Sequence, residues 1–411
     1  MISQAKTVNP ELLAPAGDLE KLRFAYAYGA DAAYAGAGDF SLRAGSGFSL
    51  AEIGEGVELA HRSGKKLYLA LNAFLRDEDL MALPPYLESL SEIGPDGLIV
   101  SDPGVFRLCR RHAPDLPLHI STQANNMSSE TMRFWADLGA SRVVLARELS
   151  LEQAAAAAVK GIESEIFVHG AICISYSGRC LISSYLTGRS ANRGDCAQSC
   201  RWRFALCEEK RPGEYYHIEE DSSGSYFFNS RDLCLLPFVP RLMEGGFASW
   251  KIEGRNKSAY YVANTVRIYR AAMDSYRRGP SGWICKKEWL QELAKVSHRR
   301  YTSNFAVSKP GADAFMYDDS RPVRRYDFAA VALSWENGLL RLEQRNHITK
   351  GDELEILLPD GEAWSVSVDA IYNEAGTRIY SANHPKEIIC VPSRPLPKAG
   401  PLICRRVARN K

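Results

Sequence analysis

The sequence has no long hydrophobic run. Within its 411 residues no stretch reaches the ~18 consecutive apolar residues of a membrane-spanning helix, and residues 1–10 lack the apolar core of a secretory signal peptide. Neither sign of charge dominates, since 51 Lys and Arg residues oppose 49 Asp and Glu residues and leave a net charge of +2. We therefore expect a cytoplasmic protein without membrane association. A uniformly polycationic surface is excluded, whereas a local basic patch is not.

Sequence motifs of several familiar enzyme classes are also missing. No Gly-x-Gly-x-x-Gly follows the first predicted strand, which disfavours a dinucleotide-binding fold. There is no His-Glu-x-x-His of a zinc protease and no Gly-x-Ser-x-Gly of a nucleophile elbow. The composition is that of a globular protein, with 45% hydrophobic and 24% charged residues.

The first part of the chain alternates short β-rich runs with amphipathic helical stretches. We predict strands at residues 11–14, 31–36, 66–72, 96–102, 118–122, 142–146, 165–169 and 250–253, and helices at 19–28, 49–63, 128–138, 151–159 and 258–276. This α/β pattern favours a (β/α)8 TIM-like barrel over residues 1–279, with an open doubly wound sheet as the alternative. The long insertion 172–248 would lie at the C-terminal mouth of the barrel, where active sites are built.

The second part of the chain has a different pattern. Residues 280–325 read as a basic linker with one helix near 287–296. Residues 326–411 show short strands at 328–333, 339–343, 353–357, 365–371 and 403–407, separated by turn residues. This even spacing predicts a small antiparallel β-barrel domain.

Cysteines are present and clustered. Five of the ten fall between residues 173 and 207, and disulfides are rare in the cytosol, so metal binding or redox chemistry is the better explanation. Cys173, Cys180, Cys196 and Cys200 suit a structural zinc or an iron–sulfur cluster, and the wide first spacing favours a [4Fe–4S] cluster. Cys207 and Cys234 are spare candidates, and Cys234 could replace one of these four ligands. We interpret the isolated cysteines as packing residues, namely Cys109, Cys285, Cys390 and Cys404.

The cysteine segment resembles the signature of the collagenase-like peptidase family. The resemblance covers residues 165–202 and continues at 11–17, 40–43, 121–124, 146–148 and 251–255. It is most similar to the branch of that family that makes 5-hydroxyuridine at the wobble position of tRNA with prephenate. The resemblance implies a barrel whose oxygen-sensitive iron–sulfur cluster is held by the same four cysteines. One turn departs from the family pattern, since Thr302-Ser303-Asn304-Phe305 stands where Thr-Gly-Phe is usual.

Charged residues at the predicted strand ends are candidates for substrate binding. Prephenate carries two carboxylates, which Arg side chains can bind in a bidentate manner, so Arg147, Arg255 and Arg43 are the cofactor-binding candidates. Salt bridges of Arg147 with Glu148 and of Arg255 with Glu253 are the alternatives. The remaining polar residues at these strand ends are Asn72, Asp102, Thr122 and Gln123.

Glu253 and His169 are the catalytic candidates. Glu253 could act as a general base or pair with an Arg. His169 could carry a proton or lie next to the cluster, and a hydrogen-bonded buried histidine is the alternative. Glu165 precedes His169 by four residues, which predicts the same strand face and a structural role.

RNA binding would need local basic patches with aromatic neighbours, and these occur in the second half of the chain. They are 277–278, 286–287, 299–301, 321, 324–326, 405–406, 409 and 411, with an ordinary solvated surface as the alternative. We thus predict an iron–sulfur-dependent tRNA uridine hydroxylase. A peptidase and a non-enzymatic scaffold subunit of a modification complex are the rivals. A homo-oligomer and a partner modification protein both stay open.

Overall fold

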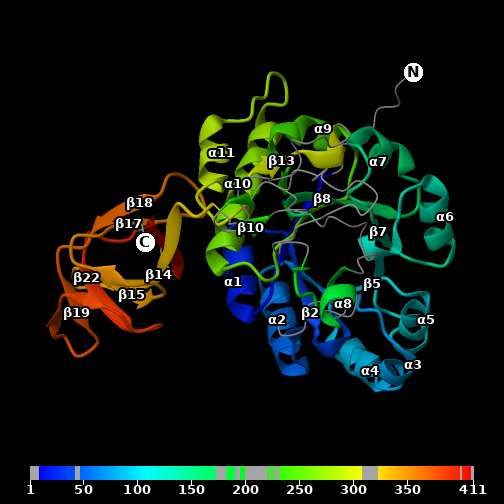
Figure 1. The fold of residues 1–411 in the computed structure, drawn as a ribbon, viewed down its shortest axis with the longest axis horizontal. Coiled ribbons are helices and arrows are strands. Elements are labelled where there is room, and N and C mark those ends of the chain that lie inside the picture. Colours follow the sequence, from blue (N-terminus) through cyan, green and yellow to red (C-terminus); the bar gives the residue numbers. More distant parts are fainter. Residues whose placement is uncertain are drawn as a thin grey trace.

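The computed structural model describes residues 9–41, 47–172, 182–189, 195–199, 220–221, 224–225, 231–307, 323–398 and 400–408. Figure 1 shows two lobes, a barrel surrounded by helices and a smaller lobe of orange and red strands beside it. Among the described residues no helix combines the length and the apolar character that crossing a membrane requires.

Eight parallel strands close into a barrel. Each strand pairs with the next one along the chain, and β8 pairs with β12, which pairs in turn with β1. The strands are β1 (Glu11–Pro15), β2 (Ala32–Ala37), β4 (Lys66–Leu71), β5 (Gly97–Val100), β6 (Leu118–Ile120), β7 (Arg142–Val144), β8 (Glu163–Ala171) and β12 (Ser249–Ile252). The predicted TIM-like barrel is therefore confirmed.

The helices of the barrel start soon after the strands, at capping residues. Asp18 accepts a hydrogen bond from the Lys21 backbone N–H, and Ser49 and Glu52 form a capping box. The helices are α1 (Leu19–Ala27), α2 (Leu50–Arg62), α3 (Asp77–Leu80), α4 (Leu83–Ile93), α5 (Pro103–His112), α6 (Ser129–Asp137), α7 (Leu151–Ala157), α8 (Ile182–Thr187), α9 (Val239–Glu244), α10 (Ala259–Arg278) and α11 (Lys287–Leu293). Short strands β3 (Gly47–Phe48), β11 (Asp232–Cys234) and β13 (Tyr301–Thr302) extend the barrel sheet, and β9 (Glu220–Asp221) pairs with β10 (Gly224–Ser225).

The second lobe is a curled antiparallel sheet, as predicted. Its strand order is β18-β17-β23-β14-β15-β22-β19-β20. The strands are β14 (Tyr326–Glu336), β15 (Leu339–Gln344), β17 (Glu353–Ile356), β18 (Trp364–Ser367), β19 (Ile371–Asn373), β20 (Arg378–Ile379), β22 (Ile388–Pro392) and β23 (Leu402–Val407), with a separate pair, β16 (Ile348–Thr349) and β21 (Ser381–Ala382). One strand predicted over 365–371 is divided between β18 and β19.

The two lobes share buried contacts. The Tyr28 hydroxyl of α1 donates to the Leu357 carbonyl at 2.7 Å and accepts from the Ile403 N–H at 3.0 Å. Arg405 of β23 is fully buried and forms a bidentate ion pair with Glu292 of α11 at 2.8 and 3.0 Å. The predicted basic surface is therefore wrong for 405–406, because Arg406 is also buried and pairs with Asp327.

The turn at residues 302–305, which departs from the family pattern, has an unusual backbone conformation. Asn304 has φ 47°, in the left-handed region that glycine adopts most easily. Asparagine tolerates this region better than other side chains, and here its Oδ1 accepts the Phe305 N–H at 2.8 Å. Asn304 thus allows the turn to keep a left-handed backbone without a glycine.

Candidate active site

The barrel interior is charged, which follows from the alternation of side chains along its strands. Glu165 of β8 and Lys251 of β12 both point inward, and Lys251 Nζ lies 2.8 Å from Glu165 Oε1. Arg142 of β7 bonds the other carboxylate oxygen at 3.2 Å. Glu165 is 0% exposed, so burial alone would raise its pKa, but Lys251 and Arg142 outweigh burial and lower it to about 2. Burial lowers the pKa of Lys251, although Glu165 opposes this effect.

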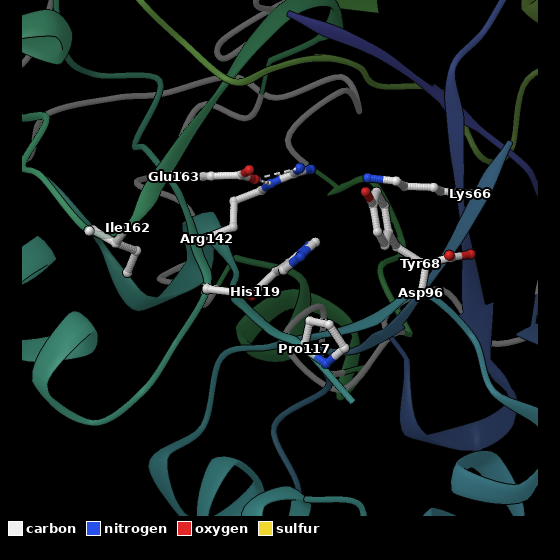
Figure 2. Close-up of a pocket in the computed structure, with 10 residues that line it drawn as sticks. Lys66, Tyr68, Asp96, Pro117, His119, Arg142, Ile162 and Glu163 are labelled. Atoms are coloured by element: carbon white, nitrogen blue, oxygen red, sulfur yellow. Dashed lines mark hydrogen bonds and ion pairs between the residues drawn. The ribbon is translucent and has the colours of Figure 1, made fainter. Parts of the chain in front are cut away.

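This charge network continues to the N-terminal opening of the barrel. Arg142 also pairs with Glu11 and Glu163, and the Tyr68 hydroxyl donates to Glu11 at 2.8 Å. A recess of about 450 Å³ opens there. Figure 2 shows the paired Arg142 and Glu163 on one side of this recess and Lys66 and Tyr68 on the other. Cations and carboxylates balance along its wall. Since the N-terminal face of a TIM barrel usually serves stability, we interpret this recess as structural.

Toward the C-terminal mouth, the network meets aromatic rings and further cations. Lys251 Nζ lies 4.3 Å from the ring centroid of Tyr34 and 5.6 Å from that of Phe167. The Arg147 guanidinium lies 4.5 Å from the same Phe167 ring and donates to the Ala171 carbonyl at 2.8 Å. Arg147 forms no ion pair with Glu148 or another described carboxylate, so the predicted alternative of a salt bridge is not what the described residues show.

Arg255 reaches the mouth from the end of β12. It is buried, and its Nη1 lies 2.6 Å from the place that a Cβ at Gly36 would occupy. A Cβ at Gly17 would lie 2.1 Å from the Arg255 carbonyl oxygen, and one at Gly170 would lie 2.5 Å from the Glu253 carbonyl oxygen. Three glycines therefore make room for residues 253–255 at the mouth. The third arginine candidate, Arg43, lies outside the described residues.

His169 does not point where the alternation along its strand predicts. Lys251 pairs with Phe167 and Ile252 with His169, so Val168 is an extra residue, a β-bulge. The bulge turns the imidazole out of the barrel, against Tyr269, Tyr261 and Tyr301 at centroid distances of 5.5, 6.1 and 5.2 Å. The prediction that Glu165 and His169 share a face is therefore wrong. Burial, with His298 and Lys257, lowers the pKa of His169 to about 3 and keeps it neutral.

The other strand-end candidates have identifiable partners. The Glu253 backbone N–H donates to the His169 carbonyl at 2.8 Å, and its side chain is half-buried at the mouth. Asp102 caps α5 by accepting from the Gly104 and Val105 N–H groups. Thr122 donates its hydroxyl to the Leu145 carbonyl at 3.2 Å. Asp102 and Thr122 thus serve the local backbone.

Of the four predicted ligand cysteines, only Cys196 is among the described residues; Cys173, Cys180 and Cys200 lie outside them. Cys196 is exposed, and its sulfur accepts the Gln198 N–H at 3.4 Å. The Ala197 N–H donates to Ser183 Oγ at 3.0 Å, so the segment holding Cys196 meets the helix that follows Cys180 in the chain. Within the described residues no cluster of three or more His, Cys, Asp and Glu side chains is arranged for a metal ion.

Cys234, the proposed substitute ligand, lies in a different environment. It pairs with His169 between β11 and β8, and the Tyr269 hydroxyl is 4.0 Å from its sulfur. Burial raises the pKa of the Cys234 thiol to about 12. The environment of Cys234 is that of a packing cysteine, protonated at neutral pH.

Two of the predicted basic patches lie at different ends of the barrel. α10 begins just after the mouth and ends at Arg278, and Arg277 bonds the Pro10 carbonyl just before β1, at the N-terminal end. Arg300 is exposed beside β11, which pairs with the mouth end of β8. Of these two patches, the one around Arg300 is therefore nearer to the predicted active site.

Sequence reasoning missed Lys251, Tyr34 and Arg142 and left Glu165 as merely structural. The signal was available, because charged and tyrosine side chains occupy alternate positions of strands that are otherwise apolar. An apolar run predicts a strand but does not by itself identify which side chains face the interior.

These features define a TIM-like barrel protein with a charged interior, a cationic mouth and a cysteine-rich segment between β8 and β12. The chain belongs to peptidase family U32. The model of that family matches residues 17–315, and the model of the peptidase family U32 C-terminal domain matches residues 324–402.

Relatives in this family carry differing names. The tRNA hydroxylation protein P1 of Bacillus subtilis is 40% identical over 93% of this chain and 92% of its own length. The 23S rRNA 5-hydroxycytidine C2501 synthase of Escherichia coli is 36% identical over 73% of this chain and 46% of its length. A collagenase of Porphyromonas gingivalis is 31% identical over 73% of this chain and 74% of its length.

Proposed function

We propose that this protein is an RNA-modifying enzyme that hydroxylates C5 of the wobble uridine in tRNA, with prephenate as co-substrate and a [4Fe–4S] cluster. Relatives named for tRNA hydroxylation and for 5-hydroxycytidine synthesis support the RNA hydroxylation part. The observation that carries the proposal in the structure is the mouth itself, where Arg147 and Lys251 lie over two aromatic rings and the Arg255 guanidinium lies beside Gly36. Cations beside apolar walls fit a small organic dianion with a ring.

Arg147 is the best candidate for binding a carboxylate of the co-substrate. Its guanidinium is held over Phe167 and uses Nη1 for the Ala171 carbonyl, which leaves other N–H groups for a ligand. Arg255 would bind the second carboxylate from the end of β12, which β8 separates from β7, with Arg43 as a further candidate. Glu253 is the candidate general base at the mouth. His169 is neutral and turned away, so a part in proton transfer would need another group between it and the substrate.

The cluster would be held by Cys173, Cys180, Cys196 and Cys200. The described part fits this assignment, because an exposed thiol that accepts a backbone N–H is a suitable iron ligand, and Arg189 lies nearby in an ion pair with Asp195 at 2.6 Å. When bound, the cluster would supply one-electron chemistry. The protein's own part is to hold co-substrate and base in a water-poor mouth.

Peptidase activity, suggested by the Porphyromonas relative, has less support. A Cys–His protease needs a thiolate beside an imidazolium. Cys234 and His169 are paired between β11 and β8, and both are neutral, since the thiol pKa is about 12 and the imidazole pKa about 3. An activated pair would have a deprotonated thiol and a protonated imidazole, and this pair has neither.

Nucleoside analysis of tRNA tests the proposal. A deletion strain should lose 5-hydroxyuridine and its derivatives, and the wild-type gene should restore them. Arg147→Ala should lower the modification about 10- to 100-fold without loss of fold, because one charged hydrogen-bonding partner is removed. Arg62→Ala, which breaks an exposed ion pair with Glu58, is the control. Unchanged 5-hydroxyuridine in the deletion strain, with no second enzyme present, would refute the proposal.

A further inference from the structure

The arginines alone could bind the carboxylates, so Lys251 is not needed for that role. Its side chain nevertheless lies inside the barrel. It is 4% exposed, and Glu165 Oε1 at 2.8 Å is its partner among the described carboxylates. Long charged side chains are rarely buried without a reason, and this pair costs desolvation that an apolar pair would avoid. A chemical role for the amine would account for this cost.

The surroundings of Lys251 lower the pKa of its ammonium group, although the Glu165 carboxylate opposes this effect. Its Nζ lies over the face of Tyr34 and near Phe167, which removes water from one side. Arg142 and Arg255 add positive charge around it. A lysine that is desolvated and placed beside other cations gives up its proton more easily and becomes a nucleophile toward carbonyl carbon.

We propose that Lys251 forms an imine with the carbonyl group of a 2-oxo acid whose carboxylate binds Arg147 or Arg255. The inference rests on the proposed function in one respect, since the proposed co-substrate is itself a 2-oxo acid. Phe167 connects the two groups, because its ring contacts both the Arg147 guanidinium and Lys251. A ligand that lies along this ring could therefore place its carboxylate at Arg147 and its carbonyl carbon at Lys251.

Glu165 stays ionised beside the nitrogen, and water carries the protons that the step requires. The Lys251 ammonium releases one proton to water, and the amine then forms a C–N bond to the carbonyl carbon. The former carbonyl oxygen takes one proton from the nitrogen and one from solvent, the C–O bond breaks, and water leaves. The product is a protonated imine, which keeps the single positive charge beside the Glu165 carboxylate. No oxidant or reductant is needed, and the imine draws electrons from the adjacent carbon.

Reductive trapping tests this inference on the intact protein. Purified protein is treated with pyruvate or phenylpyruvate and cyanoborohydride, and adducts are measured by intact mass and peptide mapping. We expect one adduct per chain on the peptide that contains Lys251. Lactate and phenyllactate, which lack the carbonyl group, should give none. Wild-type mapping alone decides the matter, even if variants fold poorly.

Two variants sharpen the result. Lys251→Arg keeps the charge but cannot form an imine, so its adduct should fall to background. Lys66→Arg changes a lysine at the opposite end of the same barrel and should label like wild type. No adduct in the wild-type protein, or equal labelling of Lys251→Arg, would overturn the inference. Trapping is independent of tRNA analysis, so an adduct with unchanged tRNA would refute the proposed function while leaving the imine in place.

Discussion

At the scale of single residues, the mouth depends on a missing side chain. Gly36 faces the interior at the end of β2, and the Arg255 guanidinium and the Ser41 hydroxyl take up the space beside it. Both would lie within 2.6 Å of an added Cβ. Sequence inspection shows a glycine here but not the arginine that needs it, because the two are more than two hundred residues apart.

Replacing Gly36 by Ala should therefore act on Arg255 and not on the fold as a whole. We expect weaker co-substrate binding, by about tenfold or more, because the guanidinium must shift from its place. Gly54→Ala is the matched control: it lies within α2 with nothing within 4 Å of an added Cβ, and it should stabilise the protein by about 0.5–1 kcal/mol. Co-substrate titration and urea unfolding measure both effects. Equal binding in wild type and Gly36→Ala would contradict the assigned place of Arg255.

At the scale of elements, β6 and β8 each bury a neutral histidine. Burial lowers the pKa of His119 on β6 to about 3, and nearby Arg142 contributes to the shift. His169 on β8 has the same value and is enclosed by tyrosines on its outer side. Both imidazoles thus remain neutral in the folded protein, where an unfolded chain would protonate them below about pH 6.5.

These histidines should make the protein sensitive to mild acid. The unfolded state binds protons as pH falls below about 6.5 while the folded state does not until about 3, so stability is lost within that window, by about 1.4 kcal/mol per pH unit for each histidine. His119→Gln should flatten the dependence of unfolding free energy on pH between about 6 and 4.5. His384→Gln, an exposed position in the second lobe, should leave the slope unchanged. A slope that His119→Gln does not alter would show that other groups cause it.

The elements also show how far sequence reasoning reaches. The eight barrel strands were predicted because apolar runs alternate with capped helices, a signal that local sequence carries. α4 and α5 were missed, since Leu83-Pro84-Pro85 and Pro103 look like helix breakers although proline is favoured in a first turn. The bulge at Val168 was invisible, because it arises from pairing with β12. Arg405 looks like surface charge for the same reason, because its bidentate partner Glu292 comes from the other lobe.

At the scale of the whole molecule, a buried ion pair connects the two lobes. Arg405 bonds Glu292 in a bidentate manner and also pairs with Glu355 at 2.6 Å. Its guanidinium lies over the ring of Tyr326. Burial alone would raise the pKa of Glu292, but Arg405, Lys295 and Arg267 outweigh burial and lower it to about 2. The lobes should therefore unfold as one cooperative unit.

Arg405→Ala should cost about 3–5 kcal/mol, because it leaves Glu292 partly buried without its main partner. We also expect the single unfolding transition to split into two. Arg341→Ala, which removes an exposed ion pair with Glu374, should cost less than about 1 kcal/mol. Calorimetry and urea unfolding would measure both. One unaltered transition in Arg405→Ala would mean that the apolar contact between the lobes suffices.

The placement of basic residues predicts where RNA approaches. Arg300 is exposed near the mouth, whereas Arg278 is exposed at the opposite end of the barrel. Arg300→Glu should weaken tRNA binding and reduce its dependence on salt, because phosphate contacts release counterions. Arg278→Glu makes the same change in charge and should bind like wild type. Equal losses in the two variants would place the RNA elsewhere.

The bulge in β8 has a consequence for how this family can change. Successive strand residues alternate between the two faces of a sheet, and Val168 is the extra residue in the pairing with β12. Loss of its single codon would therefore restore regular pairing and leave His169 in the outward position next to Phe167, still opposite Ile252. Such a deletion would shorten β8 without exchanging side chains between the barrel interior and the helices, so relatives that differ in length at this position should keep the imidazole outside the barrel.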